Sequence, residues 1–453
     1  MSMAASGGPR ARGINAFLLR SAVVAALGGL LFGFDTVVIS GANRALSETY
    51  QLSAWLLGFT VASALWGTVL GSMFAGIPSD RYGRRACLRA LAILYVITAL
   101  GCALAPNWYL LVFFRLVGGL AIGGSSVIGP MYIAEIAPAA KRGRLVGLFQ
   151  FNIVTGILLA YLSNYLVGQA ALGGDEWRWK LGIAAVPAAV FFLALFAIPQ
   201  SPRWLVRRGQ RDEARRVFLQ IGEPDPDGEV RDVLESLGAE GKTKSEPLFR
   251  RKYRFPIFLA ISIGMFNQLS GINAILYYLN TIFEKAGFDK VSSDLQAVAI
   301  GLTNFIFTIV AMLVIDRLGR KKLLLIGAAG TAVCLAGVTA IFATGRHENL
   351  LVWLLVGFIA FFAFSQGAVI WVYLSEVFPN LVRAKGQSLG SFTHWIMNAI
   401  ISQVFPLMAA ASGAIPFGFF AAMTVVQFFV VLVAYPETKG VTLERMQKEL
   451  GID

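Results

Sequence analysis

The chain has 453 residues, of which 57% are hydrophobic and only 14% are charged. A soluble domain carries roughly 25% charged residues, so the excess apolar surface must face lipid rather than water. The formal net charge is +13, which in a soluble chain would suggest a nucleic-acid partner. Here the basic residues gather in short loops between apolar segments, and this distribution argues against nucleic-acid binding.

A transmembrane helix needs about 20 consecutive, mostly apolar residues. Twelve such segments follow one another, approximately at residues 16–42, 54–78, 87–105, 108–134, 144–167, 181–199, 254–283, 295–315, 323–344, 351–374, 384–409 and 414–434. The sequence therefore predicts an all-α polytopic membrane protein with twelve transmembrane helices in a lipid bilayer.

Asp35 stands inside the first apolar segment. An ionised side chain at bilayer depth costs at least ~2.5–3.5 kcal/mol on insertion scales, so such residues face a partner or a watery cavity. A protein that moves protons across a membrane needs a group of this kind. The alternative is an aspartate that only ties two helices together through an ion pair, and position alone does not separate the two interpretations.

Basic residues cluster in alternate loops. These loops contain Arg81, Arg84, Arg85, Arg89, Lys141, Arg142, Arg144, Arg317, Arg320, Lys321 and Lys322. The opposite loops hold little or mixed charge, as in Arg44 with Glu48. Short basic loops mark the cytoplasmic face of a membrane protein. With an even number of spans, this places both termini in the cytoplasm of a multi-pass protein of the inner (plasma) membrane.

The charge is also concentrated in one segment near the middle of the chain. Residues 200–252 hold 22 of the 65 Asp, Glu, Lys and Arg residues, with helix breakers at Pro224, Pro226 and Gly228. We expect four parts: an N-terminal six-helix bundle at 1–199, cytosolic linker helices at 200–252, a C-terminal six-helix bundle at 253–436, and a cytosolic tail at 437–453.

The two predicted bundles share motifs at nearly constant spacing. The string that begins at Asp80 (DRYGRR) returns at Asp316 (DRLGRK), an offset of 316 − 80 = 236. Glu135 returns as Glu376, and Pro199 as Pro436, at offsets of 376 − 135 = 241 and 436 − 199 = 237. Three near-equal offsets indicate duplicated halves, the architecture of carriers that rock two bundles around a site near the bilayer midplane.

The repeated charged residues suggest a gate at the cytoplasmic side. The set consists of Asp80, Arg81, Arg84, Arg85, Glu135, Arg142, Asp316, Arg317, Arg320, Glu376 and Arg383. Pairs such as Glu135 with Arg142 could hold the bundles together in one state and part in another. The alternative is ordinary surface pairing, worth ~0–1 kcal/mol for each pair. Repetition of the whole set in both halves favours the gate.

The same residues carry a family resemblance along essentially the whole chain. The matching strings are 29–35 (GLLFGFD), the two D-R-x-G-R loops, 115–119 (RLVGG), 199–205 (PQSPRWL), 267–273 (NQLSGIN), 375–379 (SEVFP) with Trp371, and 436–440 (PETKG). In order and spacing they resemble the sugar porter family of the major facilitator superfamily.

This resemblance implies a central sugar site built from amides and aromatic rings. Its predicted members are Phe32, Gln150, Asn267, Gln268, Asn273, Tyr277, Asn304, Trp371, His394 and Trp395. Amides suit the hydroxyl rim of a sugar, and aromatic rings suit its C–H faces. For a single buried amide, the alternative is a hydrogen bond between helices. Asn267 and His394 replace glutamines that are common in the family, and the alternative for His394 is a packed, neutral histidine.

The resemblance also implies proton coupling, because proton-moving sugar porters have an aspartate at the position of Asp35 and an arginine at that of Arg115. Movement of Asp35 relative to this guanidinium would change its proton affinity. We therefore predict a proton-coupled monosaccharide symporter that works by alternating access, as a monomer and without a cofactor. The alternatives are a facilitative uniporter with a static Asp35–Arg115 pair, or a transporter-like sugar sensor. The sequence shows no catalytic triad, metal cluster or phosphate-binding loop, so an enzyme is not expected.

Overall fold

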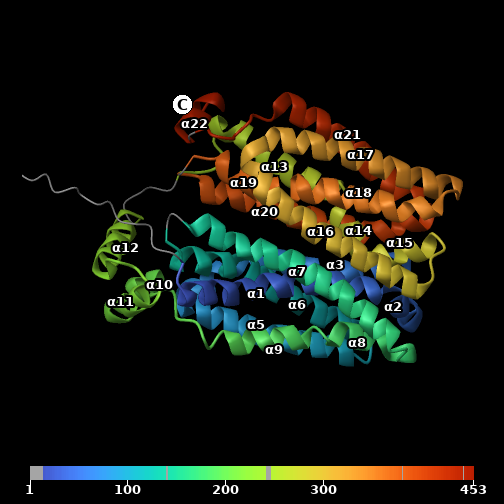
Figure 1. Cartoon of the computed structure of the whole chain (residues 1–453), viewed down its shortest axis with the longest axis horizontal. Helices are drawn as coiled ribbons and strands as arrows, with labels where there is room; N and C mark the ends of the chain where they lie inside the picture. The colour runs from blue at the N-terminus through green and yellow to red at the C-terminus, as the bar shows by residue number, and fades with distance from the viewer. Residues whose placement is uncertain (1–13, 139–140, 241–245, 380, 442, 453) are drawn as a thin grey trace, which may run out of the picture.

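The computed structural model describes residues 14–138, 141–240, 246–379, 381–441 and 443–452, and all regular elements within these ranges are helices (Figure 1). The first half contains α1 (Ala16–Val38), α2 (Asn43–Tyr50), α3 (Ala54–Phe74), α4 (Gly76–Tyr82), α5 (Arg84–Leu104), α6 (Trp108–Ile136), α7 (Arg142–Gln169), α8 (Glu176–Gly182) and α9 (Ala185–Ala194). The linker contains α10 (Pro202–Arg207), α11 (Arg211–Gln220) and α12 (Pro226–Glu240).

The second half is built in the same way. It contains α13 (Arg254–Leu269), α14 (Ile272–Tyr277), α15 (Leu279–Lys285), α16 (Lys290–Leu318), α17 (Arg320–Thr344), α18 (Leu351–Phe364), α19 (Gln366–Glu376), α20 (Arg383–Ala411), α21 (Ala414–Ala434) and α22 (Leu443–Glu449). Short 3₁₀ turns at Ile39–Gly41, Gly173–Asp175, Arg251–Tyr253 and Glu348–Leu350 complete the described elements.

Twelve helical segments among the described residues are long and apolar enough to cross a membrane, as predicted. Most lie within a few residues of the expected ranges. The sixth span differs, because it runs over 173–194 rather than 181–199. The charged residues Glu176 and Lys180 made its first turns look too polar for a membrane, but the fold buries both.

Helices α1–α9 pack together as a first bundle and α13–α21 as a second, while α10–α12 lie at one end (Figure 1). Glycine allows the closest contacts within the first bundle. An added Cβ on Gly33 in α1 would lie 1.9 Å from the backbone oxygen of Ile153 in α7, and one on Gly156 would lie 2.0 Å from that of Leu30. Small residues of this kind let membrane helices approach at backbone distance.

The two halves also use glycine at equivalent turns. Gly83 and Gly319, in the repeated D-R-x-G-R loops, have φ of +91° and +90°. Only glycine adopts this backbone region without steric strain, which explains its place in both copies of the motif. We call the end of the molecule that carries these two loops the basic end and the opposite end the far end.

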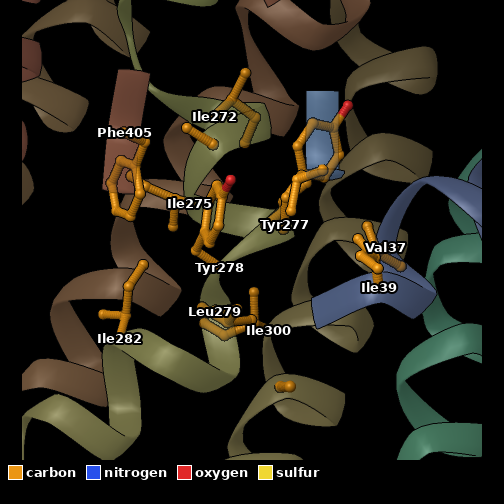
Figure 2. Packing of buried hydrophobic residues seen from close by; sticks show 14 of the residues in the cluster. Val37, Ile39, Ile272, Ile275, Tyr277, Tyr278, Leu279, Ile282, Ile300 and Phe405 are labelled. Atoms are coloured by element: carbon orange, nitrogen blue, oxygen red, sulfur yellow. The ribbon is translucent and has the colours of Figure 1, made fainter. Parts of the chain in front are cut away.

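The bundles meet along α3 with α20 and along α7 with α16. Toward the far end, a continuous apolar cluster crosses between them (Figure 2). In it, Ile275, Tyr278 and Leu279 of the second bundle share a core with Val37 and Ile39 of the first. Burial of this much apolar surface closes the far end to water.

Toward the basic end, the bundles instead lie apart and border a large, open cavity of about 1260 Å³. Its walls come from α3 and α6 of the first bundle, from α19 and α20 of the second, and from the linker residues Pro247, Leu248 and Phe249. The molecule is therefore open at the basic end and closed at the far end.

Candidate functional site

A second, smaller cavity of about 120 Å³ lies where the two bundles meet. Nine of the ten predicted sugar-site residues line it: Phe32, Gln150, Asn267, Asn273, Tyr277, Asn304, Trp371, His394 and Trp395. They come from α1 and α7 of the first bundle and from α13, α14, α16, α19 and α20 of the second. The fold thus gathers residues that are separated by more than 300 positions in the chain around one space.

Two of the lining amides are free to bind a ligand. Gln150 and Asn304 form no hydrogen bond with another residue in the part of the chain that the structure describes, although Asn304 is only 8% exposed. Neither amide is among the buried polar atoms that lack a partner, so both remain accessible from the cavity. Each of these side chains therefore offers both donors and an acceptor to a polar molecule in the cavity.

The tenth predicted residue, Gln268, does not line the cavity. Gln268 is 1% exposed. It lies behind the lining residues and hydrogen-bonds to three of them. Its Nε2 lies 3.1 Å from Asn267 Oδ1 and 3.3 Å from the ring nitrogens of His394, while its Oε1 accepts from Asn273 Nδ2 at 3.2 Å. In this conformation Gln268 orients neighbouring polar groups rather than facing the space itself.

Aromatic rings form one wall of the site. Trp395 lies edge-on to Phe32 at 5.4 Å between ring centroids, so this contact joins the second bundle to the first. His394 lies 5.1 Å from the Trp395 ring and 5.2 Å from that of Trp371. Trp371 and Trp395 also line the large cavity, so the two rings separate the small site from the space that opens toward the basic end.

The sequence interpretation missed several polar residues at this site. Asn398 is fully buried and donates from Nδ2 to the hydroxyl of Tyr277 at 3.0 Å, and Ser402 donates to Asn398 Oδ1 at 3.2 Å. Thr36 and Thr308 line the cavity. A spacing of four links His394, Asn398 and Ser402, which places them on one helix face. This four-residue spacing was the sequence signal that could have identified Asn398 and Ser402.

Asp35 and Arg115, the predicted coupling residues, are not bonded to each other in this conformation. Arg115 is 5% exposed, and it donates from Nε to the carbonyl of Thr60 at 3.1 Å and from Nη2 to that of Val61 at 3.5 Å. Asp35 is half-buried and makes no hydrogen bond or ion pair with another described residue. The two groups still interact electrostatically at longer range.

The predicted gate residues form two matching clusters at the basic end. In the first bundle, the Arg84 guanidinium lies 2.8 Å from Glu135 Oε1 and 3.0 Å from Asp80 Oδ1. In the second, Arg320 lies 3.0 Å from Glu376 Oε1 and 3.0 Å from Asp316 Oδ1. Both arginines are largely buried, and every one of these pairs stays within its own bundle.

The third repeated motif completes each cluster. Gln200 Oε1 accepts from the backbone N–H of Arg85 at 3.0 Å, and Glu437 Oε1 accepts from that of Arg320 at 2.9 Å. These residues therefore cap the first turns of α5 and α17, where backbone N–H groups have no partner within the helix. The three repeated strings are distant in sequence but adjacent in space in both halves.

The remaining gate residues bond mainly to backbone. Arg85 donates to the carbonyl of Ile198 at 2.9 Å, and the carbonyl of Arg81 accepts from Arg208. Arg142 and Arg383 donate to the carbonyls of Ala134 and Phe378. The structure therefore differs from the suggested pairing of Glu135 with Arg142, because Glu135 forms its ion pair with Arg84.

In the second copy of the loop, the backbone carbonyl of Arg317 likewise accepts a hydrogen bond from a basic side chain, Lys439 Nζ, at 2.6 Å.

Comparison with known proteins agrees with this architecture. Residues 21–450 match the family described as Sugar (and other) transporter. The chain is 39% identical over 434 residues to the probable metabolite transport protein CsbC of Bacillus subtilis, covering 94% of this chain and 93% of that one. It is 36% identical over 441 residues to the arabinose-proton symporter of the same organism, covering 95% of each.

A solved structure shows the same fold. The inward open conformation of the xylose transporter XylE from E. coli matches with a TM-score of 0.85 at 33% identity, over 96% of this chain and 100% of that one. The family match spans nearly the whole chain, and the helices superpose on a solved transporter. This chain therefore belongs to the sugar transporter family of the major facilitator superfamily, and it is a multi-pass membrane transporter rather than an enzyme.

Proposed function

We propose that this protein is a proton-coupled monosaccharide symporter that works by alternating access. The observation that carries the proposal is the small cavity between the bundles, lined by amides and aromatic rings and adjoining a larger cavity that opens at one end. The arabinose-proton symporter and the xylose transporter among its relatives supply further support.

In this proposal the sugar hydroxyls bind the unpaired amides of Gln150 and Asn304, together with Asn273. Phe32, Trp371 and Trp395 cover the apolar C–H faces of the ring. Because the site includes side chains from both bundles, bound sugar favours conformations in which the bundles approach each other. Gln268 and Asn398 act indirectly, since they fix Asn273, His394 and Tyr277 in place.

The proposed proton carrier is Asp35. It lies in α1 between Phe32 and Thr36, which both line the sugar cavity. Its carboxylate is not paired with Arg115 in the conformation described. Opening of the far end requires, in this proposal, a local shift of α1 against α6 within the first bundle in addition to the rocking of the bundles. Approach to the Arg115 guanidinium then stabilises the charged form of Asp35. Proton binding and release are thereby linked to the conformational change rather than to contact with the sugar.

We also propose an orientation and a mode of closure. The basic end faces the cytoplasm, as expected from its arginine-rich loops, so the conformation described is open to the cell interior. The two clusters around Arg84 and Arg320 form the cytoplasmic gate when residues 1–199 and 253–436 rock together, with 200–252 as a cytosolic linker and 437–453 as a cytosolic tail. A single chain of the inner membrane, with both termini in the cytoplasm, is sufficient for this cycle.

The proposal is tested by recording the external pH of proteoliposomes while glucose, galactose, fructose, xylose, arabinose and mannose are added in turn. Alkalinisation with one sugar is expected, since a symporter removes a proton from outside with each sugar molecule. Uptake of labelled sugar without any pH change would show a facilitative uniporter. Specific binding without uptake would show a sugar sensor.

A further inference from the structure

Four charged side chains form one network that joins the two bundles at the far end, away from the sugar site and from the repeated motifs; the more exposed Arg44 pairs separately with Glu284 at 3.5 Å. Lys180 Nζ of α8 lies 3.2 Å from Asp294 Oδ2 of α16, and Lys290 Nζ of α16 lies 2.7 Å from Glu176 Oε2 of α8. Both pairs cross between the bundles. A third pair, Lys180 with Glu176 at 3.0 Å, links them into one network of two positive and two negative groups.

Most of this network is withdrawn from water. The side chains of Lys180, Asp294 and Glu176 are 1%, 2% and 8% exposed, whereas Lys290 is half exposed. A single buried charge without a partner costs several kcal/mol. Asp294 has its ion-pair partner on the other bundle, and Lys180 and Glu176 each gain a second partner there. The network is therefore complete only when the far end is closed.

The network is also connected to the helix that carries sugar-site residues. Asp294 accepts a hydrogen bond from Asn280 Nδ2, and Asn280 Oδ1 accepts from Ser40 Oγ at 2.7 Å. Asn280 lies in α15, directly after the short helix α14 that supplies Asn273 and Tyr277 to the cavity. Nearby, Asn43 Nδ2 donates to the carbonyl of Tyr277 at 2.8 Å across the bundle interface.

We propose that Glu176, Lys180, Lys290 and Asp294, here called the far-end clasp, hold the outer pathway shut and must separate each time that pathway opens. The proposal rests on the alternating access proposed above. An ionic clasp suits a gate, because the water that enters on opening solvates the separated charges. The clasp thus fixes which surfaces meet in the closed state without making opening prohibitively unfavourable.

Variants that remove charges from the far-end clasp should differ in how strongly they favour the far-end-open state. Asp294→Asn or Lys180→Met leaves an unbalanced charge in the closed state, while the open state is solvated and little affected. Each single variant should therefore raise the ratio of far-end-open to far-end-closed molecules, by about fivefold or more. In Lys180→Met/Asp294→Asn one charge of each sign is removed, so the increase should be smaller than the product of the two single increases.

The ratio can be measured by pulsed electron–electron double resonance in sugar-free proteoliposomes. Spin labels at Leu172→Cys and Arg346→Cys report the separation of the bundles at the far end, since both positions are exposed there, one in each bundle. The buried Cys87, Cys102 and Cys334 are replaced by alanine in every sample. Asp175→Asn is the matched control, because it removes an ion pair with Arg178 that lies within the first bundle.

Where a far-end-open population is present, unchanged distance distributions in both single variants, or a double variant equal to the product of the single effects, would overturn the clasp. Asp294→Asn is the milder single variant, since Lys180 keeps its pair with Glu176. The double variant conserves the charge balance of the network. Folding of every variant is checked by elution as one sharp peak in size-exclusion chromatography. Because no sugar or proton gradient is used, this outcome is independent of whether transport is coupled to protons. Absence of any far-end-open population, even in the double variant, would instead count against alternating access.

Discussion

The polar residues of the proposed sugar site divide into two groups that sequence alone does not distinguish. Gln150 and Asn304 line the cavity without hydrogen bonds to other described residues, whereas Gln268 is held by Asn267, Asn273 and His394. A ligand in the cavity can bind the first group directly, because these amides are accessible and form no hydrogen bond with another described residue. The second group holds the lining residues in place before the ligand binds, which lowers the entropic cost of binding.

Substitution of one glutamine from each group should therefore have different effects. Gln150→Ala removes a direct contact, so it should weaken sugar binding by about 0.5–1.5 kcal/mol and leave the melting temperature unchanged. Gln268→Ala removes the partner of buried polar groups, so it should weaken binding and also destabilise the fold by about 1–3 kcal/mol. Calorimetric titration and thermal unfolding of the purified protein measure the two quantities, with exposed Gln220→Ala as control.

Equal melting temperatures for the two variants would contradict the supporting role of Gln268. Unchanged affinity in Gln150→Ala would remove that residue from the site.

At the scale of helices, the first bundle depends on contact between α1 and α7 at backbone distance. Because α1 also carries Asp35 and Phe32, this contact fixes the proposed proton carrier relative to the sugar cavity. The close approach leaves no room for a side chain at Gly33, so the helix pair tolerates no increase in volume there without moving apart.

Gly33→Ala should therefore separate α1 from α7 and reduce stability by about 1–3 kcal/mol. Gly76→Ala in α4 is the matched control, because an added Cβ there meets nothing within 4 Å. Apparent melting temperature and the yield of monodisperse protein in detergent report the difference. Equal values for the two variants would show that the contact between α1 and α7 is looser than described.

Hydropathy predicted the helices well, because lipid forces each span to satisfy its backbone internally and to present apolar side chains. Hydropathy misplaced helix boundaries where charged residues find their partners on other helices. Glu176 and Lys180 gain partners from α16, and this explains the late start predicted for the sixth span. The seventh predicted helix is divided into α13, α14 and α15, with Gly271 at φ +81° at the first break.

The residues of the candidate site could also be predicted only in part from the sequence. Family motifs predicted the lining residues because motif positions map onto helix faces, and nine of ten line one cavity. Pairings were harder to predict. Glu135 was matched with Arg142, its neighbour in sequence, but its partner is Arg84, which is 51 positions away. Sequence spacing indicates neighbours along one helix, whereas the contacts between helices depend on how the bundle packs.

At the scale of the whole molecule, the bundles are sealed at the far end and apart at the basic end. The motifs of both halves are compatible with either end being open, because two such conformations differ by only a few kcal/mol. The conformation therefore had to be observed. In it, the ion pairs of Arg84 and Arg320 lie within their own bundles, and the proposed sugar site adjoins the larger cavity.

In the proposed cycle, Asp35 couples sugar movement to protons. The most direct measurement compares wild type with Asp35→Asn in proteoliposomes, using a sugar transported by the wild type. Two assays are run: accumulation driven by an imposed pH gradient, acid outside, and exchange of labelled for unlabelled sugar without a gradient. Wild type should accumulate sugar above its external concentration, while Asp35→Asn should only equilibrate it and retain exchange. Normal accumulation by Asp35→Asn would show that this carboxylate does not couple sugar to protons.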